Sequence, residues 1–248
     1  MSGKLPKAPL QEAIFEMRWP LQPDSTGGQL HDAEYRFALG KFQEALKEYF
    51  PHHVAKFPDE VPQQFLNYKP AHQFWKAENT WPIIQLGPGI VTVNDTEQNY
   101  VWDTTYLPNI KTALAALKES YGTLAFNTLA LRYIDAVRVA DYEKESWEAF
   151  VKDNVNFHFS NKFDTRGDLT RFNFEQNFDM SHLGNLNIAI SSGVNNKKED
   201  VFIWQTAVTK NDKTNFDELL SWLEEAHQCT SNTFKEFCKK DFYASFSQ

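Results

Sequence analysis

Charged side chains recur at alternate positions in the first strand-like segment of the chain. In PLQEAIFEMRWPL, residues 9–21, the even positions include Glu12, Glu16 and Arg18, and the odd positions from 13 to 19 are apolar. Successive side chains of a β-strand point to opposite faces, so this spacing predicts one buried face and one charged face. Carboxylates and guanidinium groups held on a rigid strand can bind a ligand through charge-assisted hydrogen bonds.

The second half of the chain shows the same alternation in the segments 128–139 and 168–178. We predict that these side chains share an outward sheet face with the charges of the first strand. Together with Glu12, Glu16 and Arg18, the candidate binding residues are Arg132, Arg138, Arg171, Asn173 and Glu175. Two compatible roles fit them. The acids of the first strand can pair with the arginines of residues 128–139 and fix how the two halves join, or the arginines can hold a carboxylate or phosphate.

No other pattern predicts catalysis. The seven histidines are scattered, and the tandem pair His52 and His53 would point to opposite faces of a strand, which disfavours a shared metal. Cys229 and Cys238 lie too far apart along a helix for a disulfide and lack metal-ligand spacing. No nucleophile elbow, phosphate loop or dinucleotide fingerprint occurs. We therefore expect no metal and no cofactor, and we favour binding over catalysis while leaving an enzymatic role open.

Composition limits the class of partner. The net charge of −8 disfavours binding to nucleic acid, which needs lysine and arginine. Aromatic residues make up 15% of the chain, as in large cores and in protein interfaces. The unpaired cysteines and the lack of an apolar leader or a membrane-length apolar run predict a cytoplasmic protein with no membrane partner.

Apolar periodicity and turn residues predict the elements that position these side chains. Helices are expected at 30–50, 105–121, 145–157 and 215–246, and strands at 11–19, 63–69, 72–78, 82–87, 90–94, 128–139, 168–178, 185–191 and 201–209. The expected core includes Phe15, Met17, Leu131, Tyr133 and Val137.

The order of these elements repeats along the chain. It predicts an α+β fold made of duplicated β-α-βββ-α units, residues 1–122 and 123–248, joined in one continuous domain. Side by side, the two units would form one curved antiparallel sheet with helices 105–121 and 215–240 on one face. This is the topology of a TATA-binding-protein-like saddle.

Four segments carry a resemblance to a known family: PLQEAIFEMRW, IQLGPGIVTVNDTEQNYVWD, LALRYIDAV and LLSWLEEAHQCTSNTFKEF. They resemble a sporadically distributed bacterial family of uncharacterised proteins of about this length. Its motifs are a PL-x-EAIFE-x-R opening, a Tyr-x-Trp before the middle helix (Tyr100 and Trp102) and an LRY-[IL]-[ND] strand. The last motif position is Asp135 here and is usually Asn in the family. The resemblance implies no catalytic residue, and such a patchy distribution is typical of accessory defence genes.

We therefore expect a non-enzymatic interaction module that binds a protein partner in an accessory bacterial system of the antitoxin, immunity or anti-phage type. The alternative is a domain that binds a small nucleotide-like anion, or acts on it, through the open sheet face. A homo-oligomer is left open by the sequence.

Overall fold

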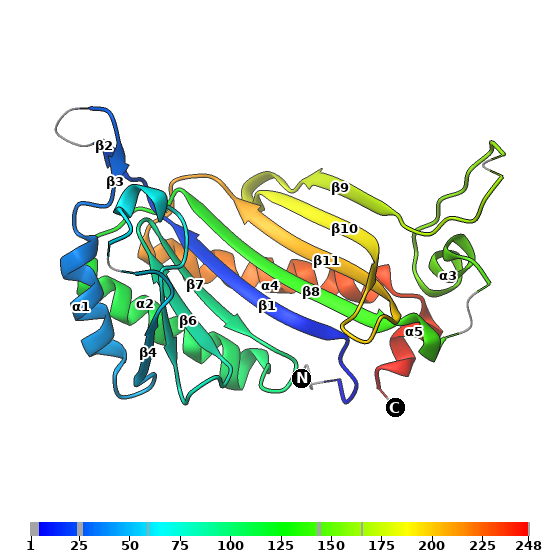
Figure 1. Cartoon of the computed structure of the whole chain (residues 1–248), viewed down its shortest axis with the longest axis horizontal. Coiled ribbons are helices and arrows are strands. Elements are labelled where there is room, and N and C mark those ends of the chain that lie inside the picture. The colour runs from blue at the N-terminus through cyan, green and yellow to red at the C-terminus, as the bar shows by residue number, and fades with distance from the viewer. Residues whose placement is uncertain (1–4, 24–26, 59, 143–144, 165, 248) are drawn as a thin grey trace. The chain divides into compact units, whose positions relative to one another are not determined.

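The computed structural model describes residues 5–23, 27–58, 60–142, 145–164 and 166–247. In this part of the chain the fold is α+β, with a nine-stranded antiparallel sheet that does not close and five α-helices (Figure 1). The strand order is β4-β5-β6-β7-β1-β8-β11-β10-β9, and β2 and β3 form a separate pair.

The strands are β1 (Leu10–Arg18), β2 (Gln22–Pro23), β3 (Leu30–His31), β4 (His52–Ala55), β5 (His72–Trp75), β6 (Ile83–Gly87), β7 (Ile90–Asp95), β8 (Thr128–Arg138), β9 (Asn173–Asp179), β10 (Asn185–Val194) and β11 (Asp200–Lys210). The helices are α1 (Tyr35–Leu46), α2 (Leu107–Tyr121), α3 (Trp147–Asn154), α4 (Phe216–Phe237) and α5 (Lys240–Ser245). No helix in the described ranges is both long enough and apolar enough to cross a membrane.

The chain divides into two compact units. Unit 1 comprises Met1–Glu12, Arg132–Val208 and Glu224–Gln248, and unit 2 comprises Ala13–Leu131 and Thr209–Leu223. Strands β1, β8 and β11 and helix α4 therefore each contribute residues to both units.

The predicted alternation of β1 is confirmed. Ala13, Phe15, Met17 and Trp19 are buried, whereas Glu12, Glu16 and Arg18 keep part of their surface exposed. The apolar face of unit 2 packs against helices. The Phe42 ring of α1 lies 5.4 Å from Phe74 of β5, and Tyr106 just before α2 donates a hydrogen bond of 2.9 Å to the carbonyl of Val93 on β7.

A buried carboxylate joins distant segments of unit 2. Asp32, between β3 and α1, accepts hydrogen bonds at Oδ2 from Trp19 Nε1 (3.0 Å), the Gly89 amide (3.1 Å) and the Tyr121 hydroxyl (2.9 Å). Burial, and then the Asp32 charge, raises the pKa of Tyr121. The tyrosine therefore remains a hydrogen-bond donor, and one side chain fixes the loop that leads into α1.

The core of unit 1 lies between its strands and the helices α3, α5 and the second part of α4. The Trp204 ring on β11 lies 6.2 Å from Phe234 and 6.0 Å from Phe242, and Phe202 lies 5.3 Å from Phe150 on α3. Since all these helices contact residues of even number on β11, they cover one face of the unit 1 strands. The other face carries the alternate set of side chains.

Some predicted boundaries are wrong. Residues 63–69 form a 3₁₀ turn (Gln63–Phe65) and further turns instead of a strand, because Pro62 precedes them and Tyr68 has a φ of 57°. Strand β4 was not predicted. Helix α1 begins at Tyr35, since Leu30–His31 pairs with β2, and the final helical segment is divided between α4 and α5.

The predicted core is confirmed for Phe15, Met17 and Leu131, which are fully buried. Tyr133 and Val137 are half-buried, and the buried residue between them on β8 is Asp135.

Candidate functional site

The outward side of the unit 1 strands is the candidate binding surface. Asp135 on β8 and Val139 directly after it are buried and face the core, so the even-numbered side chains of β8 from Arg132 onward face outward. We call the outward set the open face of unit 1. It consists of Arg132, Ile134, Ala136 and Arg138 on β8, Ile203 and Gln205 on β11, Asn187, Ala189 and Ser191 on β10, and Asn173, Glu175 and Asn177 on β9.

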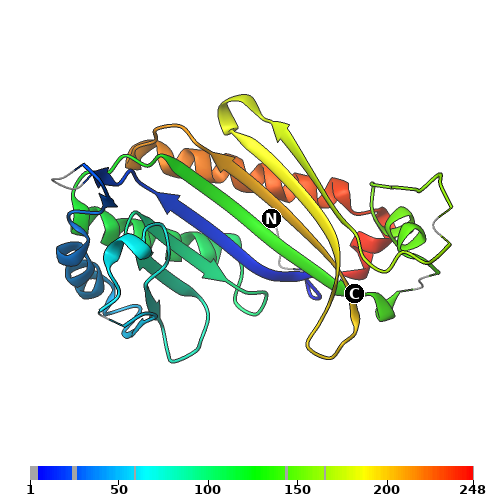
Figure 2. The same cartoon turned by 45° about the horizontal axis from the view of Figure 1, so that its top comes forward.

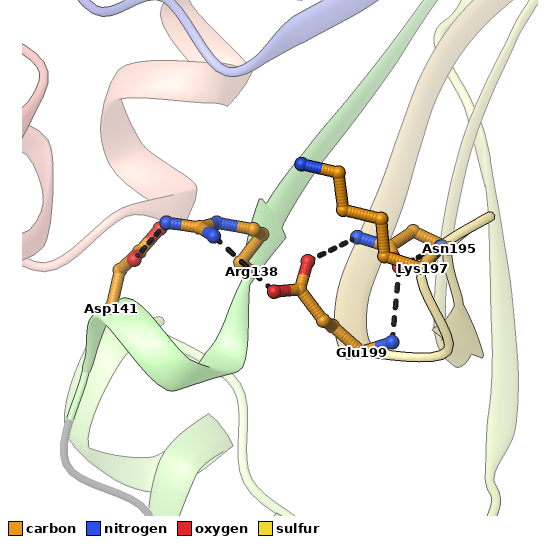
Figure 3. Close-up of polar contacts among 5 residues, drawn as sticks. All are labelled: Arg138, Asp141, Asn195, Lys197 and Glu199. Carbon is orange, nitrogen blue, oxygen red and sulfur yellow. Dashed lines mark hydrogen bonds and ion pairs between the residues drawn. The ribbon is translucent and has the colours of Figure 1, made fainter.

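An ion-pair cluster lies where β8 ends (Figure 3). Arg138 donates two hydrogen bonds to Asp141, of 2.6 and 3.1 Å, and pairs at 3.4 Å with Glu199, which directly precedes β11. Asn195 in the β10–β11 hairpin donates to the second oxygen of Glu199 (2.8 Å) and accepts from the amide of Lys197 (2.9 Å). The hydrogen bonds and charge of Asp141, and then the charge of Glu199, raise the pKa of Arg138. Because the guanidinium is solvent-exposed, these pairs orient side chains more than they stabilise the fold.

A second polar cluster crosses β9, β10 and β11. Asn187 donates to Glu175 (2.6 Å) and to its cross-strand neighbour Asn177 (3.0 Å), and it accepts from Gln205 (3.4 Å). These side chains hold one another in fixed positions on a sheet, which is the arrangement that directional recognition needs.

The remaining side chains of the open face are mostly small or apolar. Ile134, Ala136, Ala189 and Ile203 are each half-exposed. Among them Arg132 is half-buried, and its Nε is buried without a hydrogen-bond partner among the described residues. A buried guanidinium donor in this condition is rare, because leaving a charged group's donor unsatisfied is costly.

The predicted residues outside unit 1 form a pair of their own. On β1, Arg18 Nε lies 2.7 Å from Glu16 Oε1, and the guanidinium is 5.8 Å from the centre of the Tyr68 ring. A joint cluster of Glu16, Arg18 and Arg132 stays a prediction. Glu12 lies in the part of β1 that belongs to unit 1 and is half-exposed.

Arg171 does not lie on a strand, since β9 begins two residues later at Asn173. It lines a loop cavity of about 490 Å³ together with the acidic residues Glu148, Asp164 and Asp168. The four predicted arginines thus have different surroundings. Arg18 and Arg138 already contact carboxylates, and this weakens the case for a phosphate held by all four.

Sequence reasoning missed a histidine pair in unit 2. His53 Nε2 on β4 lies 2.9 Å from His72 Nδ1 on β5, and the ring centres are 5.1 Å apart. Burial lowers the pKa of His53. No sequence signal was available, because the pairing depends on a strand that was not predicted. Within the described ranges, no three His, Cys, Asp or Glu residues are grouped so that they could hold a metal ion.

Sequence reasoning also missed Asp135, although its odd position on the apolar face of β8 was a usable signal. Its side chain is buried in unit 1, and burial raises the pKa of its carboxyl group to about 8. Burial, and then the charge of Asp135, raises the pKa of Cys238 to about 12. Asp135 is thus an uncharged acid near neutral pH and the cysteine a thiol, neither of which suits nucleophilic chemistry.

The chain matches no protein-family model, no curated protein and no solved structure.

Proposed function

We propose that the protein is a non-enzymatic interaction module and that the open face of unit 1 binds a protein partner. The observation that carries this proposal is the half-buried Arg132, whose Nε has no hydrogen-bond partner in the described part of the chain. An unsatisfied buried donor costs about 1–3 kcal/mol in the free protein. A carboxylate of a partner would supply the missing acceptor and remove that cost.

The composition of the open face supports a protein as the partner. Half-exposed Ile134, Ala136 and Ile203 provide apolar contact area, while the clusters around Arg138 and Asn187 provide polar groups. Protein interfaces combine an apolar, desolvated part with polar surroundings in this way. The polar side chains are already ordered by their mutual hydrogen bonds, so less conformational entropy is lost on binding.

We further propose a role in an accessory bacterial system of the antitoxin, immunity or anti-phage type, in the cytoplasm. The sequence resemblance to a sporadically distributed family supports this role.

We also propose that the fold is a duplicated β-α-βββ-α saddle. Supporting this, the strands that follow β1 in the sheet order on the side away from β8 are β7, then β6, then β5. Those that follow β8 on the side away from β1 are β11, then β10, then β9. In both series, strands farther from β1 or β8 come earlier in the sequence.

The test compares Arg132→Ala with a matched control. The partner is first isolated with the tagged protein from the native host and identified, and binding to the purified partner is then measured by calorimetry. Truncating one member of a desolvated charged pair costs about 2–5 kcal/mol, so Arg132→Ala should weaken binding at least about thirtyfold. Its melting temperature should stay within a few degrees of the parent, because no described residue accepts a hydrogen bond from Arg132 Nε.

The control is Arg36→Ala, which removes an exposed arginine from α1 in unit 2 and should leave binding unchanged. If Arg132→Ala unfolds the protein yet binds normally once refolded, Arg132 is structural and the proposal is wrong. Stabilisation by a nucleotide, lost in Arg132→Ala, would instead assign the face to a small anion.

A further inference from the structure

Strand β9 lies at one edge of the nine-stranded sheet. It is the last strand in the order and pairs with β10, and within the described residues it has no second strand neighbour (Figure 2). All its residues except Phe174 are exposed, and its sequence NFEQNFD contains no lysine, arginine or proline. Natural proteins commonly place those residues on an edge strand to prevent pairing with another chain.

The backbone groups of β9 that point away from β10 can be identified. The Ser192 amide donates to the Phe172 carbonyl (3.1 Å) and the Met180 amide donates to the Gly184 carbonyl (2.8 Å), in line with the antiparallel register that sets Asn185 opposite Asp179. Even-numbered residues therefore bond toward β10. The amides and carbonyls of the odd-numbered residues, from Asn173 to Asp179, face the free edge.

The sequence of β9 is nearly the same read in either direction. An antiparallel pair of two copies about Gln176 would place Asn173 opposite Asp179, Phe174 opposite Phe178, Glu175 opposite Asn177 and Gln176 opposite itself. Odd residues then face odd residues, as their outward backbone groups require. No two acids are opposed.

Neighbouring registers place acidic side chains opposite one another. A shift of the pairing by two residues keeps odd-numbered residues opposite one another. In one direction it sets Glu175 opposite Glu175 of the other copy, and in the other direction it sets Glu175 opposite Asp179. Like charges directly opposite each other destabilise a sheet. The register centred on Gln176, called the central register below, is therefore the favoured one, and it also uses the whole length of the strand.

An apolar groove borders the same strand on the helix side. Its volume is about 330 Å³, and its lining includes Phe174 and Phe178 of β9, Leu186 and Ile188 of β10, and Phe237 of α4. Phe174 already contacts Phe159 at a ring distance of 4.7 Å, whereas Phe178 is 41% exposed. In the central register the exposed Phe178 ring would lie beside Phe174 of a second copy, in a non-hydrogen-bonded pair where side chains come closest.

We propose that β9 pairs antiparallel with β9 of a second copy of this chain, so that a two-fold axis passes beside Gln176. The interaction uses the backbone edge and the groove-side phenylalanines. It does not depend on the proposed function of the open face.

Two lysine substitutions test both the dimer and its register. Gln176→Lys places two lysines opposite each other at the axis, and it should raise the dimer dissociation constant at least about tenfold. Asn177→Lys places the same charge one residue along the strand, opposite Glu175 of the partner, and should leave the dimer as stable as the parent or more so. Both residues are exposed, so circular dichroism should show the parent's secondary structure for each variant.

The measurement is sedimentation equilibrium of the full chain at concentrations up to roughly 100 µM, above the micromolar dissociation constants of small interfaces. The parent should fit twice the monomer mass of 28.8 kDa. A parent that stays monomeric overturns the proposal, and so does equal dimerisation of the parent and Gln176→Lys.

Cysteine cross-linking supplies an independent readout in a Cys229→Ser background. Opposed Cα atoms at a non-hydrogen-bonded site lie about 4.5 Å apart, within the range of a disulfide. Gln176→Cys should therefore form an intermolecular disulfide under mild oxidation. Glu175→Cys should not, because residue 175 faces residue 177 of the other copy; equal cross-linking of both variants would overturn the register.

Discussion

Replacing Asp135 with asparagine should stabilise the protein, and the gain should grow as the pH rises. The carboxyl group is buried in unit 1, and burial raises its pKa from 3.8 to about 8. Between these two values the folded protein keeps the proton while the unfolded chain loses it. Unfolding therefore releases a proton, and the free energy of unfolding falls as the pH increases from about 4 to about 8.

The size of the effect follows from the same two values. Each tenfold change in the proton equilibrium is worth about 1.4 kcal/mol, so a pKa raised by about four units costs the folded state on the order of 5 kcal/mol at pH 8 or above. Asparagine has nearly the same shape and does not ionise. Asp135→Asn should thus match the parent near pH 4 and be several kcal/mol more stable near pH 8.

The assay is urea unfolding of parent and variant at intervals from pH 4 to pH 9, and the quantity of interest is their difference at each pH. Taking the difference cancels the titration of groups common to both proteins. The control is Asp153→Asn, the same substitution at an exposed position on α3 in the same unit. A difference for Asp135→Asn that is flat with pH would show that the buried carboxyl does not hold its proton.

Three further predictions concern unit 2. Phe15→Ala removes a fully buried ring and should cost about 3–5 kcal/mol in urea unfolding; a melting temperature within two degrees of the parent would mean that the faces of β1 are reversed. Gly87→Ala should be strongly destabilising, because a Cβ there would lie 1.9 Å from the Lys69 carbonyl oxygen, whereas Gly40→Ala meets open space in α1 and should stabilise by about 0.5–1 kcal/mol. Similar melting temperatures for the two would contradict the close approach. Burial lowers the pKa of His53 from 6.5, so the free energy of unfolding should fall as the pH drops below that value, and His53→Gln should reduce this slope; equal slopes in thermal melts would refute it.

The elements that sequence predicts well are those in which local pattern and tertiary packing agree. The period of two in β1 places Phe15 and Met17 in the core and leaves Glu16 and Arg18 half-exposed. Pro108 and Gly122 mark the first turn and the end of α2, as expected from their backbone preferences. The corresponding alternation on β8 and β10 similarly identifies most of the open face.

The features that the sequence did not predict depend on contacts between residues far apart in the chain. The pairing of His53 with His72 requires β4 and β5 to be neighbours, which no local pattern indicates. Arg171 fits the alternation of the residues after it, but the strand begins only at Asn173. Asp135 has the polarity of an exposed residue, and its burial follows from the packing of β8 against helices.

The Asp32 carboxylate has a consequence for the chain during its synthesis. Its donors Trp19, Gly89 and Tyr121 lie 13, 57 and 89 positions away, respectively. A ribosome adds roughly 5–20 residues per second, so Tyr121 is made roughly 4 to 18 s after Asp32. Until then the carboxylate must remain hydrated, and the loop before α1 lacks the hydroxyl that completes its burial. The loop before α1 therefore cannot complete its native hydrogen bonds until α2 has been translated.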